Sequence, residues 1–263
     1  MGALMLLAVD IGNTGITIGL FPRGVLGPHW RLASDSERTA DEYGILLMQL
    51  LDRVKGSPVH VDHIAIASVV PPLTGTIYHA CREYIGVTPL VVDAGTKTGI
   101  KVRYEDPKQV GADRIVQAAA VRKLFKGPAC VVDFGTATIF DAISADGEYL
   151  GGAIAPGIRI SSDALFQRAA KLPRVEIQRP PSAIGRNTAH ALQSGLLYGY
   201  VGLVEGMVQR FRKELGPETK TVGTGSLIEL IARETKSIDI IDPWLPLKGL
   251  HIVHTLNLKR SNS

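Results

Sequence analysis

Hydrophobic positions gather in short runs at the start of the chain, and polar turn residues separate these runs. The two apolar runs at 6–11 and 16–21 predict a β-hairpin. After this hairpin, strand-like and helical segments take turns. We expect a third strand near Trp30, a helix at 40–54, a strand at 64–69, a helix at 71–84, a strand at 89–92 and a helix at 111–126. This order predicts a mixed β-sheet with helices on its faces.

The second half of the chain repeats this order of elements. We expect three strands that end near Ile154, a helix at 161–171, an Arg- and Pro-rich connection at 173–185, a long helix at 189–215, a strand at 220–222, a helix from Ser226, a strand at 238–241 and a closing helix after Pro246. The repeat predicts an α/β fold of two duplicated domains, at 1–118 and 119–263, with a cleft between them. Gly127 and Pro128 end the preceding helix and place the hinge close by.

Both predicted hairpins carry the same motif at their first turn. One run reads Val9-Asp10-Ile11-Gly12-Asn13-Thr14, and the other reads Val132-Asp133-Phe134-Gly135-Thr136. Glycine lets a backbone come close to a ligand and present its N–H groups, and the short hydroxyl and amide side chains add neutral donors. Two such loops facing one cleft would suit a polyphosphate. A third copy, at 92–95, has no strand-like run after it, and we interpret it as a loop.

The aspartates of these loops need a separate explanation. A carboxylate at ~4 Å from a phosphate oxygen is repelled by roughly 4 kcal/mol when the effective dielectric constant is near 20. The contact becomes favourable if a cation lies between the two groups, or if the carboxylate orients a water on a metal. We therefore interpret Asp10 and Asp133 as residues that handle cations. A plain hairpin turn explains one Asp-x-Gly copy as well, but two matched copies favour the nucleotide interpretation.

A second acidic site lies between the two hairpins. In the run from Tyr104 to Arg114, Gly111 opens a helix whose first turn holds Asp113 and Arg114. An acid in this position can simply complement the helix dipole. Alternatively, Asp113 is a general base that accepts a hydroxyl proton, and Arg114 holds a substrate carboxylate. Thr188, before the long helix, is part of an N-cap or contributes a hydroxyl to a substrate.

Composition and charge narrow the functional class. The net charge is +4 (29 basic and 25 acidic residues), without a run of basic residues, so an anionic small molecule is favoured over nucleic acid. The apolar start of the chain lacks a basic leader and runs straight into the Asp10 loop, and no apolar stretch reaches membrane-spanning length. Two cysteines, Cys81 and Cys130, are consistent with buried thiols in a reducing compartment. We expect a cytoplasmic protein without a membrane or nucleic-acid partner.

Glycines recur on one face of the long predicted helix. They are Gly195, Gly199, Gly202 and Gly206. Each glycine lowers helix stability by about 1 kcal/mol relative to alanine, so this stripe suggests close packing against another backbone. The neighbour is either a symmetric partner subunit or the sheet of the same chain. Motifs of P-loop NTPases, zinc hydrolases and serine hydrolases are absent from the sequence.

Together these motifs resemble the type III pantothenate kinases, in the superfamily of acetate and sugar kinases, heat-shock chaperones and actin. The likeness runs over nearly the whole chain. The motifs that carry it are Asp10–Thr14, Gly111–Arg114, Asp133–Thr138, Gly151–Gly157 and the segment from Gly185 to Gly206. The resemblance implies two duplicated actin-like (ribonuclease H-like) domains. It also implies ATP-dependent phosphorylation of pantothenate to 4'-phosphopantothenate, the first step of coenzyme A biosynthesis.

The same resemblance implies roles for individual residues. Asp113 would be the catalytic base, Asp133 would ligate a monovalent cation (K⁺ or NH₄⁺), and Asp10 would act through water on the Mg²⁺ of ATP. ATP would meet Asp10, Ile11, Gly12, Asn13, Thr14, Gly15, Ile16, Thr17 and Thr136. Pantothenate would meet Tyr104, Gly111, Ala112, Asp113, Arg114 and Thr188. A homodimer is implied as well.

Three positions depart from the family pattern, and two other functions stay open. Ile139 and Pro246 stand where threonine is usual, and Ser226 stands where glycine is usual. None of them removes a proposed catalytic group. The alternatives are a kinase that acts on another small hydroxy acid or sugar, and a regulatory homologue that binds nucleotide without turnover. The retained Asp10, Asp113 and Asp133 argue against the regulatory alternative.

Overall fold

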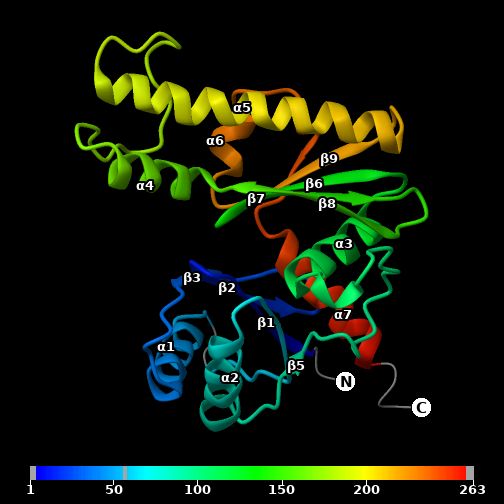
Figure 1. Cartoon of the computed structure of the whole chain (residues 1–263). Helices are drawn as coiled ribbons and strands as arrows, with labels where there is room; N and C mark the ends of the chain where they lie inside the picture. Colours follow the sequence, from blue (N-terminus) through cyan, green and yellow to red (C-terminus); the bar gives the residue numbers. More distant parts are fainter. Residues whose placement is uncertain (1–3, 56–57, 259–263) are drawn as a thin grey trace. The chain divides into compact units, whose positions relative to one another are not determined.

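The computed structural model describes residues 4–55 and 58–258 and divides the chain into two compact units (Figure 1). Unit 1 comprises Met1–Ile100, Asp106–Lys123 and Leu245–Ser263, and unit 2 comprises Lys101–Glu105 and Leu124–Trp244. Each unit contains one five-stranded mixed sheet with helices against it. The predicted α/β fold with two similar halves is therefore confirmed.

The sheet of unit 1 has the strand order β3-β2-β1-β4-β5. Its elements are β1 (Met5–Ile11), β2 (Gly15–Pro22), β3 (His29–Ala33), α1 (Ala40–Asp52), β4 (His63–Ser68), α2 (Pro71–Ala80), η1 (Cys81–Ile85), β5 (Leu90–Val91), η2 (Pro107–Gln109), α3 (Ala112–Leu124) and α7 (Leu245–Leu258). The first three strands are antiparallel, and β4 and β5 run parallel to β1. Alternate residues of β1, among them Leu7, Val9 and Ile11, enter the core formed with α1 and α2.

The last helix of the chain, α7, also belongs to unit 1. It packs on β1, β2 and β4, where Gly19 leaves room for the side chain of Leu247. It also crosses α3 so closely that a Cβ added at Gly249 would overlap the carbonyl of Val116. These contacts tie α7 to the helix that carries Asp113.

The sheet of unit 2 has the strand order β10-β9-β6-β7-β8. Its elements are β6 (Ala129–Phe134), β7 (Ala137–Ile143), β8 (Tyr149–Pro156), α4 (Ile158–Arg168), α5 (Thr188–Leu215), β9 (Lys220–Gly225), α6 (Ile228–Ala232) and β10 (Ile240–Ile241). Strands β6, β7 and β8 repeat the antiparallel arrangement of β1, β2 and β3, and β9 runs parallel to β6. The long helix α5 covers one face of this sheet (Figure 1).

The division of the chain differs from the predicted boundaries of 1–118 and 119–263 in three places. The closing helix α7 returns to unit 1, the five residues 101–105 belong to unit 2, and residues 119–123 stay in unit 1 with the rest of α3. Contacts explain the first difference, because the apolar face of α7 is buried on β1, β2 and β4. A backbone bridge between Val102 and Tyr149 explains the second. Among the described residues, no helix combines the length and apolarity that crossing a membrane requires.

Candidate active site

The first predicted loop is the tight turn between β1 and β2 in unit 1. The amide of Gly12 donates to the carbonyl of Gly15 at 3.0 Å, which closes the turn. Ser34, just after β3, donates its hydroxyl to the carbonyl of Gly12 at 2.5 Å and so braces the loop from the side. Asn13 and Thr14 are exposed at the tip. The turn therefore exposes the amide side chain of Asn13 and the hydroxyl of Thr14, and their contact with a ligand stays a prediction.

Asp113 lies at the same end of the unit 1 sheet as this turn. Strand β4 ends beside β1, and the amide of Val69 donates to the carbonyl of Ile11 at 3.1 Å. A Cβ added at Gly111 would come within 3.1 Å of Val69 Cγ1 and would overlap Asp113 Oδ1. The Gly111–Asp113 turn is thus pressed against the carboxyl end of β4, next to the strand that carries Asp10. In open α/β sheets, ligands bind at this end of the parallel strands.

The environment of Asp113 suits a general base. Burial raises the pKa of its carboxyl group, and the backbone hydrogen bond and positive charge of Arg114 oppose that shift only in part. The Arg114 amide donates to Asp113 Oδ1 at 2.8 Å, which fixes the orientation of the carboxylate. A carboxylate with a raised pKa holds a transferred proton better than an exposed one does.

The second predicted loop is the turn between β6 and β7 in unit 2. The amide of Gly135 donates to the carbonyl of Ala137 at 3.0 Å, a bond equivalent to the Gly12–Gly15 bond of the first loop. Gly157, at the start of α4, packs directly on the Gly135–Thr136 backbone, where a Cβ would overlap the Thr136 carbonyl. The Ser226 amide donates to the Phe134 carbonyl at 3.2 Å. The second loop is therefore held by contacts with two other segments.

The surroundings of Asp133 offer oxygen atoms for a cation. Asp133 pairs in register with Thr224 of the parallel strand β9, so their side chains lie on the same face of the sheet. The hydroxyl of Thr224 is buried and has no hydrogen-bond partner within the described part of the chain. Gly225, whose φ is +91°, leaves the space beside Asp133 Oδ1 into which a Cβ would project at 2.6 Å. Carboxylate and hydroxyl oxygens are ligands that hard cations accept.

Within residues 4–55 and 58–258, no group of three or more His, Cys, Asp or Glu side chains is arranged to hold a metal ion. A cation at Asp133 would therefore depend on one carboxylate together with hydroxyl and carbonyl oxygens.

The predicted substrate residues are divided between the two units. Gly111, Ala112, Asp113 and Arg114 belong to unit 1, whereas Tyr104 and Thr188 belong to unit 2. The ring of Tyr104 lies over Gly151, whose φ of +130° and missing side chain leave it room. The backbone amide of Arg103 donates to the Tyr149 carbonyl at 2.8 Å, and the guanidinium of Arg103 makes two 2.9 Å bonds to Glu148. These bonds fix the segment that carries Tyr104 on β8.

Thr188 is the first residue of α5 and is exposed. The N-cap is Asn187, whose side chain accepts a hydrogen bond from the His190 amide at 2.8 Å. The predicted N-cap before the long helix is therefore confirmed, with Asn187 as the capping residue. A contact between the Thr188 hydroxyl and a substrate stays a prediction.

Sequence reasoning missed two contributions to these loops. Ser34 braces the first turn, and Thr224, which the family pattern associates with the adenine side, faces Asp133. The sequence carries only a weak signal for either of them, because each acts through a neighbouring strand that is far away along the chain. Thr224 could have been suspected from the small residues of the Thr221–Gly225 run, which leave a hydroxyl inside a strand.

Comparison with solved structures defines the class of protein. The chain superposes with a TM-score of 0.62 and 20% identity on a protein described as a Baf family transcriptional activator from Campylobacter jejuni, covering 96% of this chain and 99% of that one. It matches an inorganic polyphosphate/ATP-glucomannokinase from Arthrobacter sp. strain KM with a TM-score of 0.50 and 14% identity, covering 98% and 100%. At these identities the comparison shows the fold alone, which is the actin-like α/β fold.

The sequence comparisons identify the family. The family profile described as type III pantothenate kinase matches residues 6–210. The chain is 53% identical over 253 residues to the type III pantothenate kinase of Moorella thermoacetica (strain ATCC 39073 / JCM 9320), covering 96% of this chain and 100% of that protein. It is 51% identical to the type III pantothenate kinase of Roseiflexus sp. (strain RS-1), covering 96% and 99%. The chain belongs to the type III pantothenate kinase family.

Proposed function

We propose that this protein transfers the terminal phosphoryl group of ATP to the hydroxyl of pantothenate and forms 4'-phosphopantothenate in the cytoplasm. Family membership supports this activity. The observation that carries it is the position of Asp113, a carboxylate with a raised pKa at the same end of the unit 1 sheet as the Asp10 turn. The reaction would supply the first intermediate of coenzyme A biosynthesis.

The two hairpin turns would bind ATP. In unit 1 the residues are Asp10, Ile11, Gly12, Asn13, Thr14, Gly15, Ile16 and Thr17, and in unit 2 the residue is Thr136. Exposed amide and hydroxyl groups of these turns would donate to phosphate oxygens. Mg²⁺, when bound with ATP, neutralises charge on the phosphates. Asp10 would orient a water on that ion, which removes the repulsion between a carboxylate and a phosphate.

Pantothenate would contact Tyr104, Thr188 and the Gly111–Arg114 turn. The proton of its hydroxyl would pass to Asp113, whose carboxylate is held by the Arg114 amide. The guanidinium of Arg114 suits the pantothenate carboxylate, because Arg binds carboxylates through paired hydrogen bonds. Phosphoryl transfer depends mainly on positioning and on charge neutralisation, so these contacts supply most of what the reaction needs from the protein.

A monovalent cation would bind beside Asp133. The buried Thr224 hydroxyl on the same face of the sheet, and the gap at Gly225, support this site. When bound, K⁺ or NH₄⁺ would offset the negative charge of Asp133 close to the phosphates, where the carboxylate would otherwise repel them.

Release of ADP in a coupled assay tests the activity and the cation together. We expect turnover on pantothenate that is several-fold higher in potassium than in sodium, and that potassium stimulation is lost in Asp133→Ala. Thr224→Val should weaken the potassium response with little effect on folding, because it removes only the buried hydroxyl.

Asp146→Ala, an exposed acid on the β7–β8 turn of the same unit, is the matched control and should respond to potassium normally. An unchanged potassium response in Asp133→Ala would refute the cation role but leave the kinase assignment intact. Turnover on sugars without turnover on pantothenate would favour the other kinase class, and no turnover on either would favour a regulatory protein.

A homodimer formed through α5 is the second part of the proposal. The sequence allowed the glycine stripe to pack either on a partner subunit or on the sheet of the same chain. In the described part of the chain, the stripe does not pack on the sheet. A Cβ added at Gly195, Gly199 or Gly202 would meet nothing within 4 Å. The face that carries these glycines is exposed, while the opposite face of α5 is buried in the core of unit 2. A partner subunit would supply the close packing that the stripe suggests.

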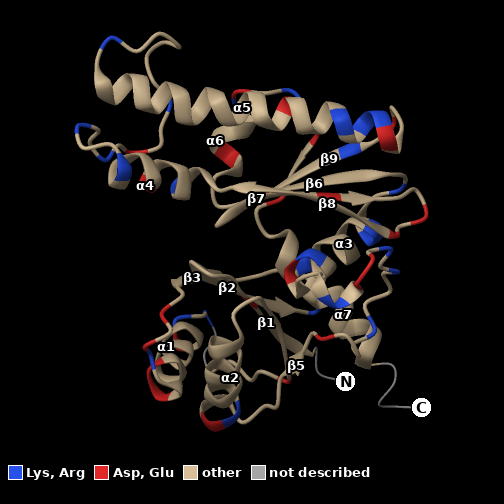
Figure 2. Ribbon diagram, in the orientation of Figure 1, with Lys and Arg blue, Asp and Glu red and all other residues tan. Residues whose placement is uncertain are grey.

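The surroundings of this stripe support an interface. Three large apolar side chains of α4, namely Ile160, Leu165 and Phe166, are at least 40% exposed. Helix α4 packs beside α5. Figure 2 shows that α5 carries few charges until its C-terminal turns. Apolar exposure of this kind marks protein interaction sites.

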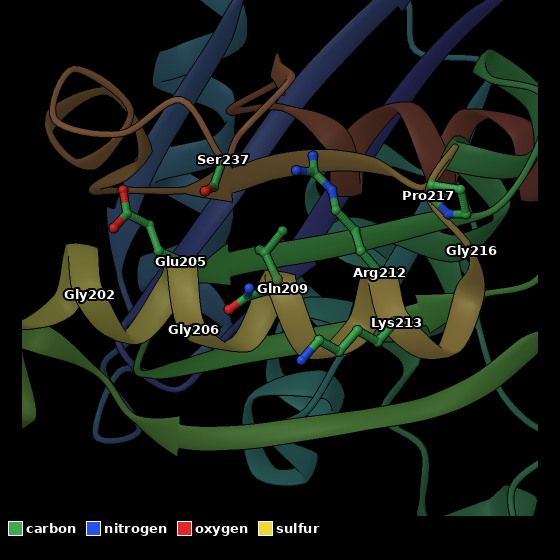
Figure 3. Close-up of a pocket in the computed structure, with 10 residues that line it drawn as sticks. Gly202, Glu205, Gly206, Gln209, Arg212, Lys213, Gly216, Pro217 and Ser237 are labelled. Atoms are coloured by element: carbon green, nitrogen blue, oxygen red, sulfur yellow. The ribbon is translucent and has the colours of Figure 1, made fainter.

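The stripe continues into a groove of about 870 Å³ along the C-terminal half of α5 (Figure 3). Gly202 and Gly206 line it, and Gln209 and Lys213 follow them at helical spacing on the same face. Glu205, whose carboxylate accepts a hydrogen bond from the Thr235 hydroxyl at 2.8 Å, stands at its edge. The polar end of the groove would form the rim of the proposed interface.

Gly199→Trp should convert the dimer to a monomer, as measured by sedimentation or by light scattering after gel filtration. The matched control is Gly75→Trp on α2, because Gly75 is also an exposed helical glycine with nothing within 4 Å. The two substitutions should therefore have different effects only if a partner subunit packs on Gly199. A dimer that survives Gly199→Trp with undiminished affinity would rule out this face as the interface.

A further inference from the structure

A second cavity, of about 460 Å³, lies within unit 1 and away from the Asp10 and Asp113 turns. Its walls are the end of α3, the outer face of α7 and the 98–100 loop. The lining residues are Thr98, Gly99, Ile100, Ala119, Arg122, Lys123, His251, Ile252, Thr255 and Leu256. Its volume falls in the range of small-molecule sites.

The walls of this cavity are held together by specific contacts. The side chain of Asn257 donates to the Lys97 carbonyl at 3.0 Å and accepts from the Lys97 amide at 3.3 Å, which fixes the loop to α7. Arg122 donates to the Gly99 carbonyl and fixes the same loop to α3. Gly99 has a φ of +73° and packs on Leu256. The cavity is therefore formed before any ligand arrives, which lowers the entropic cost of binding.

The lining combines an apolar floor with a cationic edge. Ile100, Ala119, Ile252 and Leu256 supply the floor. Arg122 and Lys123 supply two positive charges, and none of the described residues that line the cavity is a carboxylate. The Gly99 carbonyl takes one of the five N–H donors of Arg122, so others remain able to reach an anion. Thr98 and Thr255 add hydroxyl groups at the edge.

We propose that this cavity binds a small amphipathic carboxylate, with the apolar body on the floor and the carboxylate at Arg122 and Lys123. Basic residues in the last turn of a helix also complement its dipole, and that effect accounts for their charge. It does not account for a cavity with an apolar floor and walls pinned by side chains on both sides. A cation is not favoured as the ligand, because the charged side chains at this cavity, Arg122 and Lys123, are positive. A nucleic acid is not favoured either, because it needs a broad basic surface.

An occupant of this cavity would touch the end of α3 opposite to Asp113. The helix begins at Ala112, beside the base, and its last turn carries Arg122 and Lys123. Binding would hence stabilise the helix that positions Asp113. The site itself does not depend on the proposed kinase activity, since its residues are not among those that we assign to ATP or pantothenate.

Isothermal titration calorimetry with octanoate tests the site on the full chain, without ATP or pantothenate. We expect saturable binding of one octanoate per chain at millimolar concentration or below, and no comparable binding of 1-octanol, which has the same apolar body without the charge. Lys123→Glu should weaken octanoate binding by about tenfold or more, because it replaces an attractive charge by a repulsive one. Thr255→Trp, which fills the mouth of the cavity, should abolish it.

Lys55→Glu, an equal charge reversal at an exposed site of the same unit outside the cavity, is the control and should bind octanoate as the unaltered chain does. Arg122 is not substituted, since it also anchors the 98–100 loop. Absence of saturable binding, equal binding of octanol, or equal weakening by Lys55→Glu and Lys123→Glu would each overturn the proposal. Kinase activity in the same preparations reports separately on the proposed function.

Discussion

Asp113→Asn should lower turnover on pantothenate by about 10²- to 10⁴-fold, because it removes the group that accepts the hydroxyl proton. The asparagine oxygen can still accept the hydrogen bond from the Arg114 amide, so the turn keeps its geometry. Steady-state measurement of kcat with saturating ATP and pantothenate gives the size of the effect.

The raised pKa of Asp113 also predicts how the same variant changes the stability of the protein. A carboxylate whose pKa is raised by folding stabilises the protein only at low pH, and this contribution is lost as the pH rises through the folded-state pKa. At neutral pH the charge of Asp113 therefore opposes folding, and Asp113→Asn should melt at the same temperature as the unaltered protein or higher. The unaltered enzyme should lose activity on the acid side at a pH above the ordinary range of an aspartate.

Asp52→Asn, an exposed acid at the end of α1, is the matched control and should leave both turnover and melting unchanged. Near-normal turnover in Asp113→Asn would remove Asp113 as the base. A large fall in melting temperature would instead give the residue a structural role, since lost activity could then follow from unfolding.

Gly249→Ala should destabilise unit 1 by about 3 kcal/mol or more, because overpacking against a backbone cannot be relieved by a side-chain rotation. The new Cβ would overlap the carbonyl of Val116, and both residues are buried. The helices α7 and α3 would have to separate. Since α3 carries Asp113, we also expect lower kcat below the melting transition. Denaturant unfolding measures the first effect.

Gly75→Ala is the informative comparison for this substitution. Gly75 also lies within a helix, α2, but it is exposed and a Cβ there meets nothing within 4 Å. The same change should therefore stabilise the protein, by up to about 1 kcal/mol, through helix propensity. Opposite signs at the two sites would confirm that Gly249 is required for the approach of the helices. A stable Gly249→Ala protein would contradict it.

Most strands and helices could be predicted from the sequence, because their local patterns are strong. The hairpins at Asp10 and Asp133 follow from paired apolar runs that a glycine-containing turn separates, and the structure confirms both. Strand β9 extends to Gly225, beyond the predicted 220–222, because its last residues are Gly and Thr, which carry no apolar signal. Helix α4 begins at Ile158, before the predicted Ser161, since Gly157 provides its N-cap.

Long-range placement was harder to predict than local structure. The closing helix has an ordinary apolar face, and nothing local shows that this face is buried in the first unit. The segment with Tyr104 appears as a loop, yet it joins β8 through a single bridge. Such contacts depend on which surfaces remain uncovered after the sheets form, so a pattern confined to one segment does not contain them.

The residues of the candidate site also differ in how far the sequence predicts them. Asp10 and Asp113 could be expected at the carboxyl ends of strands or at a helix start, and the structure of unit 1 brings their turns to one end of its sheet. The contributions of Ser34 and Thr224 depend on strand register, and register between β6 and β9 joins residues that are about ninety positions apart. Single-sequence reasoning finds the residues that carry chemistry more readily than the residues that support them.

The return of α7 to unit 1 has a consequence for synthesis on the ribosome. Unit 2 is almost continuous, from Leu124 to Trp244, so its sheet can assemble as soon as that stretch has emerged. The first sheet is translated earlier, but the surface of β1, β2 and β4 stays uncovered until the final helix leaves the exit tunnel. The sheet that is made first is thus covered only after the second sheet has been translated, and during this interval we expect its uncovered strands to be the surface most open to aggregation.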